Sequence, residues 1–539
     1  MLVRRLLKRR SPPAQCILFW NKTSRKPSGK SQQSTRIIRP DLLYMMVVMQ
    51  GTPLPFASDL DKRPAYDVAI IGGGFSGVMT AVHLLRRCRP AASILLIERG
   101  EKLGRGLAFG THTAEHLLNV PVRNMSAFAD EPSHFLEWLQ RHKNAEISPN
   151  AFVSRQWYGE YVDSLLAEQL RQPDSPSLRC VHEEVVTIER QGETLRLTMT
   201  DSSHHEARLV VLAVGNFPPP DPAPLRQLSD RRYARYAWSP EALDGIADSE
   251  SILLIGSGLT AIDQVVALNG RGFTGTIYML SRRGLLPALH QPGTAWPTEW
   301  TAELPASIRP LVAEVRRQVR LAADRGVDWR AVIDSLRPAT QRIWRSLNLA
   351  ERKRFLRHVR CFWEVHRHRV APEVGRILDE LQESGRLVMK AGRVLACVEG
   401  DGHVEITYRN RGTIAAEMLR VSRIINCTGH ETDARKIDSP IVKSLLENDL
   451  ARVDSGALGL DISTDGAVID GSGVPSKSLF ALGSVRKGLL WESTAVPEIR
   501  VQAQSLAERL AQELADMASS FKAAESTSSR QKTAVNEMC

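Results

Sequence analysis

The chain has 539 residues, which is enough for two or three domains that each have a core of their own. Hydrophobic residues make up 43% of it and charged residues 24%, as in ordinary globular proteins. Of the net charge of +11, residues 1–64 carry +10, because they hold 13 of the 71 Lys and Arg and three of the 60 acidic residues. The remainder is nearly neutral, so charge gives no case for a nucleic-acid partner.

Residues 1–64 are expected to be a basic, disordered leader. The apolar run at 16–20 is too short for the core of a signal peptide, and the run at 42–49 falls far below the roughly 20 residues that a membrane span needs. Two interpretations stay open: an organelle transit peptide, or a start placed upstream of the natural one among the methionines at 45–49. The second is favoured, so we expect a cytoplasmic protein with no membrane partner.

The seven cysteines are scattered along the chain. None forms a C-x-x-C pair or a spacing typical of metal sites. This distribution indicates a reducing compartment and argues against a structural zinc site, so no metal is expected.

The first ordered element is expected at residues 67–71, a short apolar run bounded by glycines and typical of a buried parallel strand. A helix over 76–87 and a strand over 93–98 complete a βαβ unit, with which a doubly wound sheet begins. Helices are predicted at 132–141 and 158–170, and a further buried strand at 208–214.

A Pro-rich segment at 217–225 marks a boundary, after which a second βαβ unit has its strands at 251–255 and 276–281. The pattern turns helical over 310–383, and strands return at 386–398, 405–408 and 421–426. A final strand at 478–482 and a final helix at 496–514 precede a polar tail.

A glycine-rich turn joins the first predicted strand to the first helix. Residues 72–77 read GGGFSG and fit the pattern G-x-G-x-x-G. In this pattern Gly72 permits the tight turn, Gly74 lets the backbone approach a pyrophosphate, and Gly77 lets the helix pack closely on the strand. Glu98, at the end of the next strand, is placed to accept hydrogen bonds from a ribose diol. The whole unit predicts a dinucleotide site rather than a turn without a ligand.

The second βαβ unit carries a related turn, GSGLTA at 256–261, which begins with Gly256 and Gly258. Its second strand ends in a serine followed by Arg282 and Arg283 rather than in an acid. A ribose 2′-phosphate needs positive charge where NAD would meet a carboxylate, and arginines supply it through charge-assisted hydrogen bonds. A solvated basic turn is the alternative, and NADPH is the favoured ligand.

Longer strings resemble the FAD-NAD(P)-binding family, which is related to the N-hydroxylating and other NADPH-dependent flavoprotein monooxygenases. They are GRGLAFG at 104–110, HLLNVP at 116–121, NMS at 124–126, VHRHR at 365–369, APE at 371–373 and the segment 488–500. The resemblance extends from about residue 66 to 514. The F-x-G-x-x-x-H pattern of Baeyer–Villiger-type enzymes and flavin-containing monooxygenases is not found in the sequence.

The resemblance implies an α/β fold, that of a two-dinucleotide-binding-domain flavoprotein. An FAD Rossmann-type domain would hold an inserted NADPH Rossmann-type domain and a helical insertion. The expected division is a leader at 1–64, a first part of the FAD domain at 65–220, an NADPH domain at 221–300, a helical Arg- and Trp-rich segment at 301–385, a closing part of the FAD domain at 386–515 and a disordered tail at 516–539.

The resemblance also implies that Arg105, Asn119 and Met125 lie near the flavin and Gly483 at its ribityl–pyrophosphate side. Many relatives have an aspartate after this glycine, where this chain has Ser484. The expected cofactor-binding residues are Gly72, Gly74, Phe75, Ser76, Gly77, Glu98, Arg105, Asn119, Met125 and Gly483 for FAD, and Gly256, Gly258, Arg282 and Arg283 for NADPH. No catalytic side chain is assigned.

Residues 342–369 form an unusually basic stretch, with nine Lys or Arg and three His against two acids. They could receive an anionic substrate or the NADPH phosphates, or they could form an amphipathic helix pair with solvated charges. Glu492 could be an active-site carboxylate or a partner for the helix dipole before Val496, and the second is favoured.

The implied chemistry is a two-step cycle. NADPH transfers hydride to FAD, and reduced FAD then reacts with O₂ to a C4a-(hydro)peroxide that hydroxylates a small polar substrate. One alternative is a flavin reductase or dehydrogenase without oxygen insertion, and another is a non-catalytic FAD-binding regulatory protein. A flavin disulfide reductase is excluded, because no two cysteines are closely spaced. Amino acids, amines and small heterocyclic acids are all compatible substrates.

Overall fold

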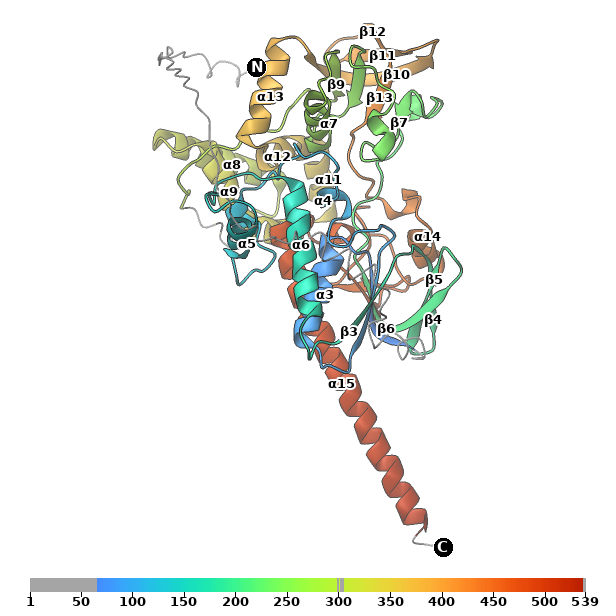
Figure 1. Ribbon diagram of the computed structural model, residues 1–539. Helices are drawn as coiled ribbons and strands as arrows, with labels where there is room; N and C mark the ends of the chain where they lie inside the picture. The colour runs from blue at the N-terminus through green and yellow to red at the C-terminus, as the bar shows by residue number, and fades with distance from the viewer. Residues whose placement is uncertain (1–64, 298–299, 301–304, 537–539) are drawn as a thin grey trace, which may run out of the picture. The chain divides into compact units, whose positions relative to one another are not determined.

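A computed structural model describes residues 65–297, 300 and 305–536, with side chains up to residue 520 (Figure 1). The expected leader at 1–64 lies outside these residues. Among the described helices, none combines the length and the apolar composition that crossing a membrane requires.

The first sheet contains five parallel strands in the order β15-β6-β1-β2-β3. They are β1 (Tyr66–Ile71), β2 (Ser93–Ile97), β3 (Ser177–Val181), β6 (His204–Leu212) and β15 (Pro475–Ala481). At one edge β14 (Ala467–Ile469) pairs antiparallel with β15. A hairpin of β4 (Val185–Gln191) and β5 (Thr194–Met199) pairs through β5 with the first half of β6, whereas β15 pairs with the second half.

Both faces of this sheet are buried, which explains the continuous apolar runs of its strands. Val68 and Ile70 face a core formed with α3 (Phe75–Arg87), α6 (Arg155–Leu170) and α15 (Val496–Asn536). Ala69 and Ile71 face a second core formed with the β4–β5 hairpin and α14 (Pro440–Glu447). In Figure 1 these two sets of elements lie on opposite sides of the strands.

The second sheet has the order β12-β11-β10-β9-β8-β13-β7. Its parallel strands are β7 (Tyr233–Ala234), β8 (Ile252–Ile255), β9 (Ile277–Ser281), β10 (Leu387–Glu399) and β13 (Arg423–Asn426), and β11 (Val404–Asn410) and β12 (Ala416–Val421) extend it antiparallel. α7 (Leu259–Gly270) and α13 (Pro372–Glu383) cover one face, and Figure 1 shows both helices on the same side of these strands.

This topology differs from the expected division of the chain. Strands within 387–426 complete the second sheet, although we assigned 386–515 to the closing part of the first. The chain returns to the first sheet only after β13, through Thr428 and Gly429. Apolar β-branched runs predict that a strand exists, but they carry no local information on which sheet it joins.

A helical segment stands between the parallel strands β9 and β10. It contains α8 (Ile308–Asp324), α9 (Trp329–Ser335), α10 (Thr340–Ser346), α11 (Leu349–His358) and α12 (Arg360–Arg367). One of its two cores includes Trp491 and Leu458, which come from the chain that closes the first sheet. The helical segment is therefore packed against the first sheet's part of the chain by apolar contacts.

Two short helices precede α6, namely α4 (Gly106–Phe109) and α5 (His134–His142). Short 3-10 helices are η2 (Val122–Asn124), η3 (Ala223–Leu225), η4 (Pro240–Leu243), η5 (Arg337–Ala339), η6 (Ala434–Lys436) and η7 (Gly483–Arg486).

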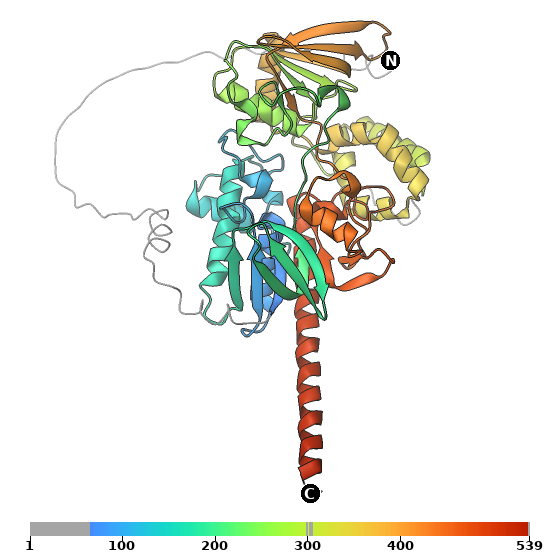
Figure 2. The same ribbon diagram turned by 90° about the vertical axis from the view of Figure 1, so that its right-hand side faces the viewer.

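The helix α15 continues to Asn536, so the expectation of a disordered tail from residue 516 is wrong for its backbone up to 536. After Pro497 the sequence of this helix contains neither glycine nor proline and is rich in Ala, Glu and Gln, which favour helix. The first part of α15 packs against α3, and in both views the last part extends past the other elements (Figures 1 and 2).

A buried ion pair links α6, beside the first sheet, to α7, beside the second. Arg155 Nη2 lies 3.0 Å from Asp263 Oδ1, and both side chains are only 11% exposed. His116 adds a hydrogen bond of 2.9 Å between its Nε2 and the Asp263 carbonyl oxygen. Burial raises the pKa of the Asp263 carboxyl, and the charges of Arg155 and His116 oppose the rise.

We predict that Arg155→Met destabilises the protein by about 3–5 kcal/mol, because it leaves a buried carboxylate without its cation. Thermal unfolding of the single variant measures the loss. The double variant Arg155→Met/Asp263→Asn removes both charges and should recover most of it. Equal unfolding midpoints for the single variant and the native chain would contradict this role of the pair.

Candidate active site

The first glycine turn lies at the carboxyl end of β1. Gly72 has φ +104°, and a Cβ there would lie 2.3 Å from the carbonyl oxygen of Ala213, which follows β6. A Cβ at Gly77 would lie 1.8 Å from the carbonyl oxygen of Gly72. These two glycines are therefore required by close approaches within the chain itself, as the pattern predicts.

Gly74 has a different environment. Its φ is −71°, and the nearest atom to an added Cβ would be Gly106 Cα at 3.5 Å, so the chain's own packing tolerates a side chain there. No side chain caps α3, and no acid stands in its first turn. The positive end of the helix and its free N–H groups thus face an open approach, which fits the pyrophosphate of a dinucleotide.

Glu98 lies beside this turn, at the end of β2. Its Oε2 accepts a hydrogen bond of 2.6 Å from Gly73 N, and its Oε1 accepts one of 2.9 Å from Gly100 N. Each carboxylate oxygen keeps a further lone pair, so Glu98 can hold the turn and still accept from a ribose hydroxyl.

The last strand of the first sheet reaches the same edge. A Cβ at Gly483, which follows β15, would lie 3.3 Å from Ser76 Oγ. Gly483 N donates to Gln502 Oε1 at 3.1 Å, and Ser484 Oγ donates to the carbonyl oxygen of Gly215. Ser484 thus binds the segment that follows β6.

Three further residues expected at the flavin are tied to the chain around them. Arg105 lies 2.9 Å from Asp163 of α6, whose pKa is raised by burial against the opposing charge of Arg105. Asn119 accepts a hydrogen bond of 2.9 Å from His290 at its carbonyl oxygen. Met125 is 3% exposed and belongs to the first core, so its side chain acts in packing.

Phe75 is buried in an aromatic group at the start of α3. Its ring centroid lies 5.8 Å from that of Tyr158 and 6.2 Å from that of Phe109. The structure therefore brings together Gly72, Gly74, Ser76, Gly77, Glu98 and Gly483 at one sheet edge, whereas Phe75 and Met125 point into the core.

The second glycine turn repeats the geometry of the first. Gly256 has φ +112°, and a Cβ there would lie 2.4 Å from the carbonyl oxygen of Cys427, which follows β13. A Cβ at Gly258 would meet no atom of the described chain within 4 Å. α7 also lacks a side-chain cap and an acid in its first turn. This turn too leaves room for a pyrophosphate at the N-terminus of a helix.

The basic residues after β9 lie beside this second turn. The Oγ atoms of Ser257 and Ser281 are 2.8 Å apart, and Gly284 N donates to Ser281 Oγ at 3.1 Å. Ser281 therefore shapes the turn. Arg282 is exposed and has no acidic partner among the described residues, whereas Arg283 lies over the ring of Phe362 of α12, 4.9 Å from its centroid. Arg282 is thus the arginine that is free for an anion.

Buried polar atoms without a hydrogen-bond partner gather where the chain closes the first sheet. Of 13 such side-chain atoms in the described residues, six lie between residues 478 and 502, among them Ser493 Oγ, Glu498 Oε2, Arg500 Nε and Gln502 Nε2. Tyr158 Oη, beside Phe75, is another. Buried groups of this kind are costly unless a ligand or water completes them, so their gathering fits a bound cofactor.

Sequence analysis singled out Gly483, Ser484, Glu492 and the segment 488–500 in this region, but it could not anticipate these unpaired atoms. Glu492 does not stand at a helix start: it is 8% exposed, accepts from Trp363 Nε1 at 3.2 Å and lies 3.0 Å from Arg367 Nη2. Arg352 donates to the carbonyl oxygen of Gly488 at 3.1 Å. Several charges of the basic stretch thus fasten the helical segment to residues 488–492, an arrangement that neither interpretation of the sequence anticipated.

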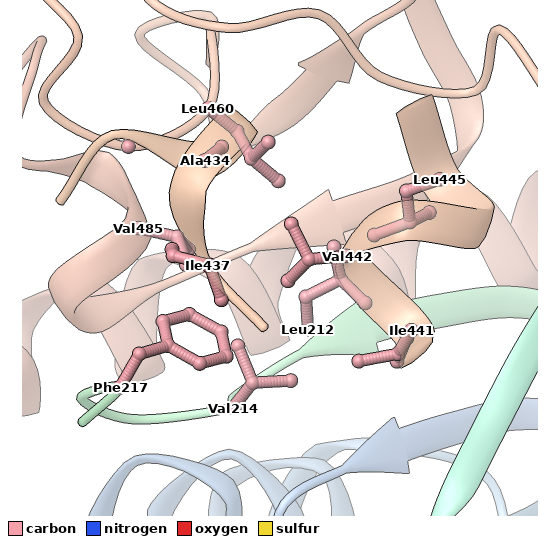
Figure 3. A pocket seen from close by; sticks show the side chains of 11 residues that line it. Leu212, Val214, Phe217, Ala434, Ile437, Ile441, Val442, Leu445, Leu460 and Val485 are labelled. Atoms are coloured by element: carbon pink, nitrogen blue, oxygen red, sulfur yellow. The ribbon is translucent and has the colours of Figure 1, made fainter. Parts of the chain in front are cut away.

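An apolar pocket lies at the end of β6, on the other side of the first sheet from α3 (Figure 3). Its walls come from the end of β6 and the residues after it, from η6 and α14, and from the chain around 460 and 485. The lining residues are Leu212, Val214, Phe217, Ala434, Ile437, Ile441, Val442, Leu445, Gly459, Leu460 and Val485. No lining side chain is polar, so this pocket offers nothing for redox or acid–base chemistry.

The two sheets, each with an uncapped glycine turn at the carboxyl end of its strands, define a two-dinucleotide-binding flavoprotein fold. Residues 69–217 match a family model described as FAD-NAD(P)-binding. The predicted fold class and the resemblance to this family are thereby confirmed, as is the expectation of FAD and a nicotinamide dinucleotide as cofactors.

An uncharacterised protein of Mycobacterium tuberculosis is 23% identical over 527 residues, covering 85% of this chain and 97% of its own length. The L-lysine 6-monooxygenase of Pseudomonas syringae superposes with a TM-score of 0.59 at 17% identity, covering 83% of this chain and 99% of its own. The ornithine N-hydroxylase of Kutzneria sp. 744, in a structure with reduced FAD, NADP⁺ and L-ornithine, gives 0.56 at 14% identity, covering 84% and 100%. These likenesses show a shared fold.

We predict that Gly258→Ala weakens NADPH binding at least about tenfold, because the methyl group occupies the space of the pyrophosphate. Because the chain leaves that space open, stability should fall by less than about 1 kcal/mol, the cost of alanine as an N-cap. Titration of NADPH and thermal unfolding measure the two effects. Gly293→Ala, whose Cβ also meets no atom of the described chain within 4 Å, serves as the control.

Proposed function

We propose that this protein is an FAD-dependent, NADPH-using monooxygenase that hydroxylates a small polar substrate. One observation carries the proposal: two uncapped glycine turns, one in each sheet, leave room for a pyrophosphate, and buried unpaired polar atoms gather in the chain that contacts the first turn at Gly483. FAD would lie on the first turn and NADPH on the second. When bound, flavin supplies hydride acceptance and O₂ activation.

The residues of this chain would bind, orient and exclude water. The N-termini of α3 and α7 would bind the two pyrophosphates, and Glu98 the ribose of FAD. Arg105, held by Asp163, would present a fixed cation near the flavin, and Arg282 would bind the 2′-phosphate of NADPH. The aromatic side chains of the helical segment would keep water from the reacting centre.

Two enzymes of similar structure support this choice. One of the two solved structures named above is an L-lysine 6-monooxygenase, and the other is an ornithine N-hydroxylase that contains both cofactors. We therefore propose a nucleophilic amine nitrogen as one candidate for the hydroxylated atom. All five cysteines in the described residues are free thiols, which agrees with the cytoplasmic location that we propose.

Anaerobic mixing of the FAD-loaded protein with NADPH tests the first half of the proposal. Loss of the oxidised-flavin absorbance is expected, and its absence would favour the non-catalytic FAD-binding protein. Admission of O₂ in the presence of amino acids and amines tests the second half. A hydroxylated product in proportion to NADPH consumed supports a monooxygenase, whereas NADPH oxidation that yields only hydrogen peroxide, or that requires an added dye, supports the reductase.

We predict that Arg282→Ala raises the Kd for NADPH about 10- to 100-fold, the loss of roughly 1.5–3 kcal/mol from charge-assisted hydrogen bonds. The Kd for NADH, which has no 2′-phosphate, should not change. Stopped-flow flavin reduction with each nucleotide gives both constants. Arg393→Ala, an exposed arginine of β10 in the same sheet, should behave as the native chain. An equal loss for NADH and NADPH would contradict a contact to the 2′-phosphate.

A further inference from the structure

A buried lysine stands one turn beyond Gly483, at the end of η7. Lys487 is 8% exposed, and its ammonium makes no hydrogen bond or ion pair with any residue in the described part of the chain. Isolated charges are rarely buried, because removing an ammonium from water is expensive unless an anion compensates it. No acid of the described residues forms an ion pair with this lysine, so its ammonium is left for an anion from outside the chain.

The surroundings of Lys487 come from two other parts of the chain. Its Nζ lies 5.1 Å from the ring centroid of Trp491, and Cζ of Arg360 from α12 lies 5.9 Å from the same centroid. Arg360 is already paired, since its Nε donates to Glu364 Oε1 at 2.7 Å. Arg367 is likewise paired with Glu492. Each neighbouring charge is neutralised except that of Lys487.

His430 completes this cluster from the segment that leaves the second sheet. Its Nε2 is buried and has no hydrogen-bond partner in the described residues. Burial and the charges of Lys487 and Arg360 lower its pKa to about 3, so the ring is neutral at physiological pH. A neutral imidazole can donate one hydrogen bond from this nitrogen. His430 thus offers a hydrogen-bond donor, and it lies close enough to Lys487 for the charge of Lys487 to lower its pKa.

We propose that Lys487 and His430 form an anion-binding site that holds the carboxylate of a small-molecule substrate. The inference rests on the proposed function, which it sharpens to the class of carboxylic acids, including amino acids, as opposed to simple amines. The pyrophosphates and the 2′-phosphate are accounted for elsewhere, at the N-termini of α3 and α7 and at Arg282. Lys487, by contrast, lies with Arg360 of α12 at the ring of Trp491, where the helical segment packs against the chain that closes the first sheet.

The test uses the FAD-loaded protein without NADPH. Small carboxylic acids, each paired with its own carboxamide, are titrated: L-lysine, L-ornithine, benzoate and nicotinate. Flavin absorbance and tryptophan fluorescence report binding, since Trp491 lies beside Lys487. We expect at least one acid to bind about tenfold or more tightly than its amide, because a charge-assisted hydrogen bond replaces a neutral one.

Three variants decide whether Lys487 is responsible. Lys487→Met should bring acid and amide within about twofold of each other, and Lys487→Arg, which keeps the charge, should restore the preference. Lys487→Met should also leave the unfolding midpoint unchanged or raise it, because it removes an unpaired buried charge. Lys477→Met, at an exposed position of β15, is the matched control and should behave as the native chain.

Several results would overturn the inference. One is that no acid binds more tightly than its amide, and another is that the preference survives in Lys487→Met. A third is a parallel loss of FAD or NADPH affinity in that variant, which would assign the cation to a cofactor. Binding is measured without NADPH and without turnover. The binding result can therefore be interpreted even if the protein proves not to be a monooxygenase, and monooxygenase activity can be established even if no acid is preferred.

The acid preference should also depend on pH. Burial and the charge of Arg360 lower the pKa of Lys487 to about 8, opposed by Glu364. The ammonium is therefore present below about pH 8 and is lost as the pH rises through that value, while His430 stays neutral throughout. Another neighbour, His368, is also kept neutral, since burial lowers its pKa. We expect the preference to vanish above roughly pH 9 in the native protein and to persist in Lys487→Arg.

Discussion

A close approach between backbones organises both halves of this molecule. At each glycine turn the carbonyl oxygen of a second segment lies where a side chain would otherwise begin: Ala213 beside Gly72 and Cys427 beside Gly256. In both cases this second segment is the chain leaving a neighbouring parallel strand. The turn and the departing chain are thus fixed by one contact. The same contact sets where a nucleotide can lie and where the chain passes from one sheet to the other.

The departing segments share a further property. Gly215 and Gly429, with φ +69° and +90°, each lie two residues after the contacts at Ala213 and Cys427. Because left-handed backbone favours glycine, the chain can turn sharply there without strain. Both sheet units therefore have a glycine with positive φ in the segment through which the chain leaves the sheet.

Sequence reasoning succeeded where the signal was local. The glycine turns, their flanking strands and helices, and the pairing of Glu98 with the first turn were all readable, because each depends on neighbouring residues and a fixed spacing. The sheet membership of residues 387–426 was not, since strand pairing is decided by distant contacts. Likewise Lys487, His430 and Arg360 come from segments far apart in sequence, so no sequence spacing could predict that they lie near one another.

The helical segment shows why composition alone was ambiguous at residues 342–369. The sequence of an arginine-rich segment does not show whether its charges are solvated, bind a ligand or pair with other residues of the chain. The structure contains the third case, with Arg367 on Glu492 and Arg352 on the Gly488 carbonyl oxygen. These contacts hold the segment that carries the unpaired polar atoms. The helical segment is thus held by polar contacts against one side of the candidate site.

Two strands, β5 and β15, share one edge of β6, and this has a consequence for how the chain folds during synthesis. The hairpin strand β5 pairs with residues 204–207 of β6, whereas β15 pairs with residues 210–212. All of residues 213–474 must be made before β15 emerges, which takes on the order of tens of seconds at roughly 5–20 residues per second. For that time the apolar end of β6 is an open strand edge, exposed to wrong pairing. The strands of the second sheet are complete by residue 426, so this sheet can form before the edge of β6 is paired.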